Sequence, residues 1–248
     1  MIVLKSLKEI ARMRAPCSIV AEVLALVVEA VEPGVTTLEL NAIAEREVAK
    51  RKAKPAFRGY SGFPCSLCCS LNEQVVHGIP NSTPLKDGDI ISLDFGAYYD
   101  GFFGDAAVTV PVGSISATAS NLIKVTERSL YIAIDKAING NRLSDISNSV
   151  QFFVESNGYS VVRDFVGHGI GRNLHEQPQI PNYGDANKGP KLKQGMVLAL
   201  EPMVNEKSYE VKVLADGWTA VTVDGGLSAH FEHTVAITEN GPEILTLI

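Results

Sequence analysis

The chain has 248 residues, of which 46% are hydrophobic and 20% are charged, and its formal net charge is −6. A chain of this length can bury a sizeable core, and the composition is ordinary for a globular protein. Nucleic-acid-binding proteins usually present a basic patch or stripe. The acidic balance therefore argues against this class, and we expect no nucleic-acid site.

Neither a targeting segment nor a membrane segment is expected. The first 16 residues mix charged with apolar side chains, unlike the apolar region of a signal peptide. The most apolar stretch, residues 17–31, is too short to span a bilayer and carries Glu22 and Glu29. We therefore expect a cytoplasmic protein.

Three of the four cysteines crowd into residues 65–69, where Cys65 and Cys68 form a C-x-x-C pair. A structural zinc site normally needs a second such pair or a pair of histidines. The sequence offers no second pair, so we expect reduced thiols that line a core or a pocket, as is usual in the cytosol.

Two pairs of helices are predicted, one in each half of the chain. Ser6 followed by Glu9 is typical of a capping box at a helix start. Thr36 or Thr37 is expected to cap the second helix, and Ser144 the fourth. The four predicted helices cover residues 7–31, 37–52, 119–138 and 144–156.

Strands are predicted after each helix pair. Residues 55–64, between the first helix pair and the first strand, are predicted to form a loop of defined shape. Asp100-Gly101 is a strong hairpin signal. The last two predicted strands also read as a hairpin-like pair. The predicted strands cover residues 65–77, 89–94, 105–110, 159–166, 192–201, 218–224 and 230–238.

One ten-residue phrase occurs twice, as LKDGDIISLD at 85–94 and as LKQGMVLALE at 192–201. Asp94 and Glu201 therefore occupy the same place in two copies. A second carboxylate follows one strand later in each copy, at Asp105 and at Glu232. A repeat of this length indicates one domain of two related halves rather than a solenoid.

We therefore expect a single catalytic domain over residues 1–248, with halves of roughly 1–115 and 116–248. Strands that follow helix pairs favour an α+β fold with a largely antiparallel sheet. If the halves are related by a pseudo-two-fold axis, the strand ends that carry Asp94 and Glu201 meet in the middle.

The four acids need counter-charges, because a buried carboxylate without a partner is very unfavourable. Each acid alone could be a rim residue or half of a salt bridge, but the nearby sequence offers no matching Lys or Arg. Two divalent ions would balance the four charges. Oxygen ligands suit Mn²⁺ or Mg²⁺, and an imidazole adds Fe²⁺, Co²⁺ and Zn²⁺.

His168 is the best candidate for that imidazole, although a lone histidine is more often a satisfied core residue. Gly167 and Gly169 flank it, and such small neighbours let the backbone approach a site closely. Two divalent ions about 3.5–4 Å apart can share a hydroxide and polarise a carbonyl. The pattern therefore points to metal-assisted hydrolysis.

With these features identified, the sequence resembles the type I methionine aminopeptidases, in their short bacterial form without an N-terminal extension. The resemblance covers about residues 3–247. It implies the pita-bread fold, in which two pairs of helices cover a central, mainly antiparallel sheet. The motifs that carry it are NEQVVHGIP (72–80), ISLDFGAYYDGFFGDAA (91–107), VGHGIGRNLHEQPQIPNYG (166–184), LEPMV (200–204), DGWTAVT (216–222) and SAHFEHTVAIT (228–238).

The resemblance implies two divalent cations per chain, Co, Mn, Fe, Zn or Ni. It assigns five metal ligands, Asp94, Asp105, His168, Glu201 and Glu232. It also implies three catalytic residues: His77 orients the peptide bond, His175 stabilises the oxyanion, and Glu201 transfers a proton. His230 and His233 match no catalytic role.

The resemblance also implies a methionine pocket and a further cation site. Tyr60, Phe63, Cys68 and Trp218 fall at pocket positions, and Phe57 and Leu174 fall where family members vary. Aromatic rings and a thiol suit a flexible thioether. An additional monovalent cation is expected near Asn72 and Ser228.

The implied reaction is removal of the N-terminal methionine from nascent proteins and peptides, with a preference for a small second residue. A hydroxide shared by the two metals would attack the scissile carbonyl. A monomer with transient ribosome contact is expected. The alternatives are a proline-specific aminopeptidase of the same fold, and a catalytically silent member that acts as a binding module.

Overall fold

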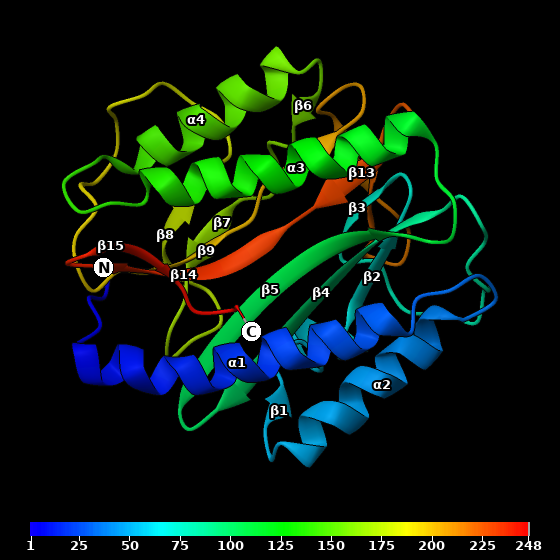
Figure 1. Cartoon of the computed structure of the whole chain (residues 1–248), viewed down its shortest axis with the longest axis horizontal. Helices are drawn as coiled ribbons and strands as arrows, with labels where there is room; N and C mark the ends of the chain where they lie inside the picture. The colour runs from blue at the N-terminus through cyan, green and yellow to red at the C-terminus, as the bar shows by residue number, and fades with distance from the viewer. Residues whose placement is uncertain (248) are drawn as a thin grey trace.

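The computed structural model describes residues 1–247, so Ile248, the last residue of the predicted second half, lies outside the described residues. The elements follow the predicted order, in which a pair of helices precedes a set of strands in each half of the chain (Figure 1). The helices are α1 (Leu7–Glu29), α2 (Thr37–Lys50), α3 (Ala117–Lys136) and α4 (Leu143–Ser156), with a 3₁₀ turn at Tyr60–Gly62.

The main sheet has nine strands, and seven of them follow the order β1-β4-β5-β14-β9-β7-β8. β2 also pairs with β4, and β15 with β14. Within residues 1–247 all pairings of this sheet are antiparallel. The strands are β1 (Lys54–Pro55), β2 (Cys68–Leu71), β4 (Ile90–Tyr99), β5 (Phe102–Pro111), β7 (Gly167–Gly169), β8 (Glu176–Ile180), β9 (Val197–Leu200), β14 (Glu232–Thr238) and β15 (Gly241–Ile244).

Two small sheets of three strands each complete the fold. One has the order β13-β10-β6 and the other the order β11-β12-β3. Their strands are β3 (Gln74–Val76), β6 (Ser160–Val161), β10 (Met203–Asn205), β11 (Val211–Val213), β12 (Ala220–Thr222) and β13 (Ser228–His230).

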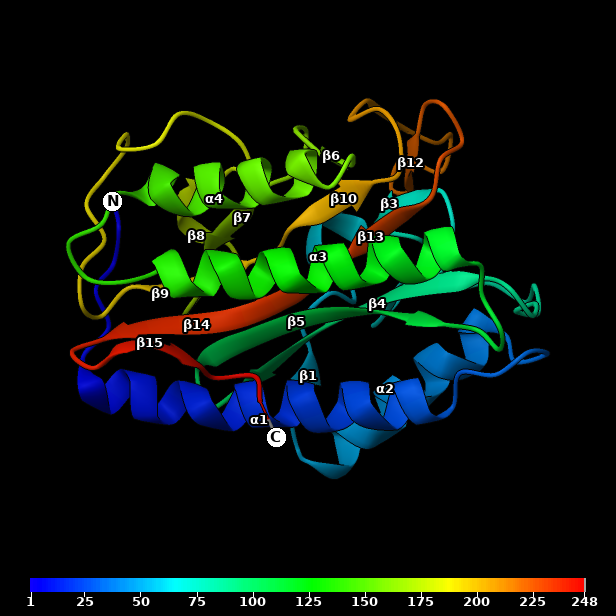
Figure 2. The same ribbon diagram turned by 45° about the horizontal axis from the view of Figure 1, so that its top comes forward.

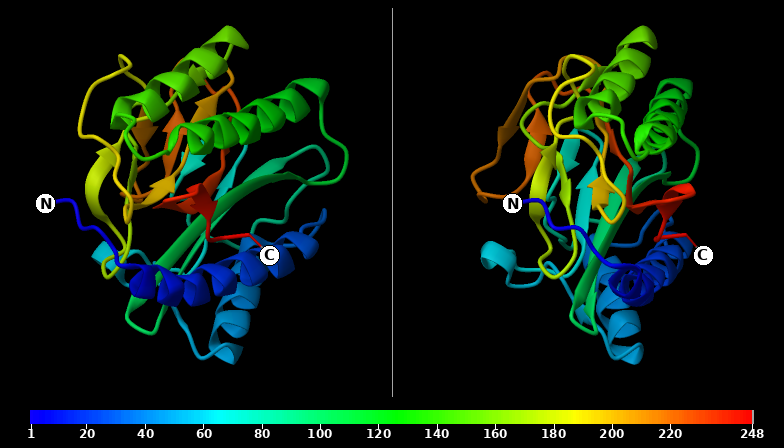
Figure 3. Two further views of the ribbon diagram at one scale, coloured as in Figure 1. Left: turned by 60° about the vertical axis from the view of Figure 1, so that its left-hand side comes forward. Right: turned by 90° about the vertical axis from the view of Figure 1, so that its left-hand side faces the viewer.

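Both helix pairs lie on one face of the main sheet, with α1 and α2 along one half and α3 and α4 along the other (Figure 2). The right-hand view of Figure 3 shows α1 and α3 on one side of the strands. The capping boxes at Ser6 and Thr36 start α1 and α2 as predicted. No helix within residues 1–247 combines the length and the apolar character that a membrane crossing requires.

Each helix pair buries its own apolar core against its half of the sheet. Val20, Val23 and Leu40 from the first pair pack with Ile91 and Leu93 of β4. In the second half, Leu122, Leu130 and Val150 pack with Leu198 of β9 and Val235 of β14. These residues are all 0 or 1% exposed, so each half anchors its strands firmly.

The seam between the halves runs between β5 and β14, where only two residue pairs are in register, Glu232 opposite Ala107 and His233 opposite Ala106. A threonine extends the pairing on each side. Thr234 Oγ1 accepts from the Asp105 amide at 3.1 Å and donates to the Asp105 carbonyl at 2.8 Å. Thr109 Oγ1 makes the same two contacts with His230, both at 2.8 Å. We call these the two threonine clasps.

Several predicted elements have different limits or partners. The strands predicted at 89–94 and 105–110 are longer, because the segment between them continues as strand up to the turn at Asp100-Gly101. The strand predicted at 159–166 is only Ser160–Val161.

Two predictions were wrong. The strands at 218–224 and 230–238 do not form a hairpin, because β12 pairs with β3 and β11 whereas β14 joins the main sheet. Ser144 does not cap α4. The N-cap is Arg142, whose amide donates to Asp145 at 2.8 Å, and the Ser144 hydroxyl donates to the Lys188 carbonyl at 2.9 Å.

Candidate metal centre

The five predicted metal ligands come from neighbouring strands of the main sheet. Asp94 lies on β4 and Asp105 on β5, and Glu232 begins β14. Glu201 directly follows β9, and His168 is the central residue of β7. The strand order β4-β5-β14-β9-β7 therefore brings residues that are far apart in the sequence to one place.

Two overlapping groups of ligand atoms in this cluster could each hold an ion. Asp105, His168 and Glu232 each offer a ligand atom, and these atoms lie within 4.8 Å of one another. Glu201, His230 and Glu232 form a second group by the same criterion. Glu232 belongs to both groups, so the geometry suits two neighbouring ions with a shared carboxylate.

The donor atoms of the cluster lack protein partners. Asp94 Oδ1, Asp105 Oδ1 and Glu232 Oε1 are buried and accept no hydrogen bond within residues 1–247. No lysine or arginine lines the cavity that these acids face. Unpartnered buried carboxylates are very unfavourable. The residues therefore fit divalent cations, which would supply the missing positive charge.

Burial perturbs all four acids in the metal-free protein, and repulsion by neighbouring carboxylates adds to its effect on three of them. Burial raises the pKa of Asp94 to about 7. Burial and then the neighbouring carboxylates raise the pKa values of Asp105, Glu201 and Glu232 well above their usual range. Without metal, the cluster therefore retains protons near neutral pH.

His168 is held in the tautomer that a metal ligand needs. Its Nδ1 lies 2.9 Å from the Gly169 carbonyl oxygen, which can only accept, so Nδ1 carries the proton. The free Nε2 lies 3.5 Å from Glu201 Oε1. Burial lowers the pKa of His168 to about 3, so the ring is neutral. A neutral imidazole oriented by a second hydrogen bond is the usual form of a histidine ligand.

The glycines beside His168 allow this close approach, as predicted. A Cβ at Gly167 would lie 2.5 Å from the Ala199 carbonyl oxygen, and one at Gly169 would lie 2.3 Å from the Gln177 carbonyl oxygen. Both obstacles are backbone atoms of adjoining segments. Any side chain at either position would therefore push β7 away from the sheet and move His168.

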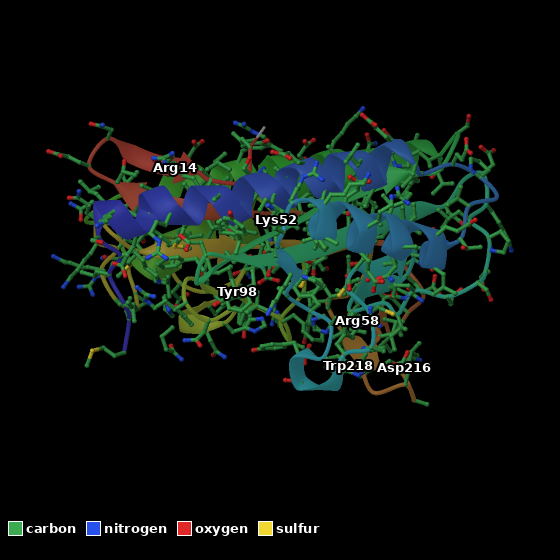
Figure 4. All side chains as sticks on the ribbon, turned by 90° about the horizontal axis from the view of Figure 1, so that it is seen from below. Arg14, Lys52, Arg58, Tyr98, Asp216 and Trp218 are labelled. Carbon is green, nitrogen blue, oxygen red and sulfur yellow. The ribbon has the colours of Figure 1, made fainter. Side chains whose placement is uncertain are left out.

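The cluster forms the floor of a cavity of about 180 Å³. Trp218 lies on the side of the molecule away from α1 (Figure 4). Phe63 and Trp218 meet edge to face, with ring centroids 5.2 Å apart. The four acids and His168 line this cavity together with every predicted pocket residue. The pocket residues are Phe57, Tyr60, Phe63, Cys68, Leu174 and Trp218.

The two predicted catalytic histidines also line the cavity. His175 lies beside His168, with ring centroids 4.3 Å apart, and its Nδ1 lies 2.6 Å from the Tyr60 hydroxyl. His77 packs edge-on against Phe165, with centroids 5.3 Å apart. Its backbone φ of 60° lies in the left-handed region, where strain is usual at functional positions. Burial, and then His175, lowers the pKa of His77 to about 4.

Asn72 and Ser228, predicted to lie near a monovalent cation, are neighbours in the structure. The Ser228 amide donates to the Asn72 carbonyl at 2.8 Å. The Asn72 side chain donates a hydrogen bond to Asp89 Oδ1 and accepts one from the Ile90 amide. The cation itself stays a prediction.

Sequence reasoning missed three residues of this region. Ser61 lines the cavity, and Phe165 holds His77. His230 was assigned no role, yet it is 1% exposed and its Nε2 has no hydrogen-bond partner within residues 1–247. Its position two residues before Glu232 was an available signal, because two residues of chain span at most about 7 Å.

The chain is similar to known metallopeptidases. The model of metallopeptidase family M24 matches residues 11–239. The methionine aminopeptidase of Clostridium perfringens is 59% identical over 248 residues, covering all of both chains. The crystal structure of methionine aminopeptidase from Thermotoga maritima superposes with a TM-score of 0.98 at 48% identity, again over 100% of both chains.

A more distant structure shares the fold alone. The prolidase from Pyrococcus furiosus has a TM-score of 0.81 at 23% identity, over 99% of this chain and 66% of that one. The predicted α+β pita-bread architecture is thereby confirmed, with its antiparallel sheet and its two pairs of helices.

Metal binding should release protons. The raised pKa values leave protons on the acid cluster at pH 7.5, and divalent ions must displace them. His168 is already neutral and releases none. We expect calorimetric titrations of metal-free protein in Hepes and in Tris to show release of about one proton or more, and metal affinity to rise with pH through 7.

The exposed Glu239 provides a matched control. Glu239→Gln should release as many protons as the wild type, whereas Glu232→Gln should release fewer. A binding heat that is independent of the buffer would contradict the raised pKa values.

Proposed function

The chain belongs to metallopeptidase family M24, and we propose that its acidic cavity binds two divalent metal ions and hydrolyses the bond after an N-terminal methionine. The observation that carries this proposal is the cluster of four acids and His168 in one cavity, where three of the acids have a buried oxygen without a hydrogen-bond partner within residues 1–247. The chain is a metalloaminopeptidase, since relatives aligned over its whole length are methionine aminopeptidases.

Asp94, Asp105, His168, Glu201 and Glu232 would hold the two ions. When bound, the ions polarise the scissile carbonyl and lower the pKa of water. The mixed oxygen and imidazole donors suit Mn, Fe, Co, Ni or Zn. The free α-amino group of a substrate would bind one of these ions or a nearby acid, which favours chain ends over internal peptide bonds.

Glu201 is the residue best placed to move a proton. It lines the cavity with its side chain 13% exposed, and its two carboxylate oxygens face His168 at 3.5 Å and His230 at 3.7 Å. Burial and then Asp94 raise its pKa, which favours acceptance of a proton. Glu201 would accept the proton of the attacking water and pass it to the leaving amine.

His175 would stabilise the oxyanion that forms on the scissile carbonyl. Donation to an oxyanion from Nε2 requires the proton on that nitrogen. The Tyr60 hydroxyl, 2.6 Å from Nδ1, fixes this tautomer when it donates to Nδ1. His77, which also lines the cavity, would orient the peptide bond.

The side walls would select methionine. Phe63 and Trp218 form an edge-to-face pair, and the buried Cys68 thiol lies on the same wall. Burial raises the pKa of Cys68, so the thiol is neutral and apolar. Thioethers pack favourably against aromatic edges. The cavity of about 180 Å³ is below the roughly 300–1,000 Å³ of drug-sized sites, which suits one side chain followed by a small second residue.

The setting of the reaction is part of the proposal. All four cysteines are free thiols, which suits the reducing cytoplasm, where nascent chains carry N-terminal methionine. The enzyme would act there as a monomer that contacts the ribosome transiently.

A peptide assay tests the function. We expect metal-loaded enzyme to release methionine from Met-Ala-Ser and to leave Ala-Pro-Ser and N-acetylated Met-Ala-Ser intact. A chelator should abolish turnover, and added Co²⁺ or Mn²⁺ should restore it. Cleavage of Ala-Pro-Ser would instead identify a proline-specific enzyme, and no cleavage with any metal would identify a silent binding module.

The role of His175 has its own test. We expect His175→Ala to lower kcat/KM for Met-Ala-Ser by about 10²–10³-fold, the usual effect of losing one oxyanion donor, with metal content unchanged. Tyr60→Phe keeps the ring but removes the hydroxyl, so it should lower kcat in the same direction and by less. Wild-type turnover in His175→Ala would rule out the oxyanion role.

A further inference from the structure

His230 occupies the position in the second half that Asp105 occupies in the first. Asp94 lies opposite Ala107 in the β4–β5 ladder. Leu200 lies opposite His233 in the β9–β14 ladder, so the next pair places Glu201 opposite Glu232. If Asp94 and Glu201 occupy equivalent positions in the two halves, then Ala107 and Glu232, the residues opposite them, are equivalent as well. Asp105 lies two residues before Ala107 and His230 lies two residues before Glu232, so Asp105 and His230 are also equivalent.

This register differs from the one read off the sequence, where Asp105 and Glu232 were taken as equivalent second acids. The two threonine clasps support the structural register independently. Thr234, four residues after His230, clasps the backbone of Asp105. Thr109, four residues after Asp105, clasps the backbone of His230. The two-fold relation that equates Asp105 with His230 therefore also equates Thr109 with Thr234.

The side chain of His230 faces the cluster, as that of Asp105 does. It is 1% exposed, and its Nε2 lies 3.7 Å from Glu201 Oε2, too far for a direct hydrogen bond. Its Nε2 also belongs to the group with Glu201 and Glu232 whose ligand atoms lie within 4.8 Å of one another. The unpartnered Nε2 and the neighbouring carboxylate oxygens leave a gap of the size that an ion would bridge.

We propose that His230 is a further metal ligand, whose Nε2 joins the carboxylates of Glu201 and Glu232 in the cluster. This inference rests on the proposed metal-dependent function. The cluster then offers two imidazoles, one from each group of ligands. A second imidazole favours Fe²⁺, Co²⁺, Ni²⁺ or Zn²⁺ over Mn²⁺ or Mg²⁺. Burial lowers the pKa of His230 to about 3, which leaves the ring neutral and able to ligate.

The neighbouring His233 supplies a matched control. It lies three residues along the same segment, but its Nδ1 is 2.9 Å from the Thr246 hydroxyl, and it belongs to neither group of ligand atoms. Substitution of either histidine by glutamine keeps a polar side chain and removes the imidazole. Circular dichroism and thermal unfolding of the metal-free variants would check that both fold.

The experiment titrates Co²⁺ into metal-free wild type, His230→Gln and His233→Gln. We expect His230→Gln to bind one of two ions at least about tenfold more weakly, with a smaller preference for Co²⁺ over Mn²⁺. The proton NMR spectrum of the Co²⁺ protein should show hyperfine-shifted imidazole N–H signals from two histidines in the wild type and in His233→Gln, but from one in His230→Gln.

Wild-type affinity and an unchanged spectrum in His230→Gln would overturn the proposal. A weaker affinity with signals from a single histidine in the wild type would also overturn it, because His230 would then act only by positioning Glu201. The variant Asp105→Asn distinguishes a failure of the His230 proposal from a failure of the proposed metal-dependent function. If the wild type binds no Co²⁺, or if Asp105→Asn binds it normally, the proposed function itself fails.

Discussion

The burial of four carboxylates without a protein counter-charge is the constraint on which the rest of the structure depends. Asp105 and Glu232 are 4 and 2% exposed, and their unpaired oxygens face one another across the seam of the sheet. The strain is tolerated because two separate helix-backed cores hold the strands in place. Function is thus obtained from an arrangement that is unfavourable until cations bind.

Near two-fold symmetry explains how such a cluster can be built. Antiparallel pairing of β5 with β14 at the seam brings equivalent positions of the two halves together, and the threonine clasps fix the backbone at Asp105 and His230. Departures from symmetry would supply the proposed chemistry. His168 and His175 come from the second half, whereas His77 and most of the proposed methionine pocket come from the first.

The sequence predicted most of the fold and nearly the whole cavity, because capping boxes, the Asp-Gly turn and the repeated phrase are local signals. It failed where partners are chosen by tertiary contacts. β12 pairs with β3 rather than with β14, and Ser144 bonds to the Lys188 carbonyl instead of capping α4. His230 was overlooked because the sequence alone aligned Asp105 with Glu232, and only the ladders show the shift of two residues.

The central claim is most directly tested by the thermal stability of Glu232→Gln at pH 8, with and without divalent metal. Removal of one buried, repelled carboxylate should raise the melting temperature of the metal-free protein above that of the wild type. It should also sharply reduce the increase that metal produces, because both ligand groups share Glu232. A variant that is less stable without metal and keeps the full metal-dependent increase would contradict the account.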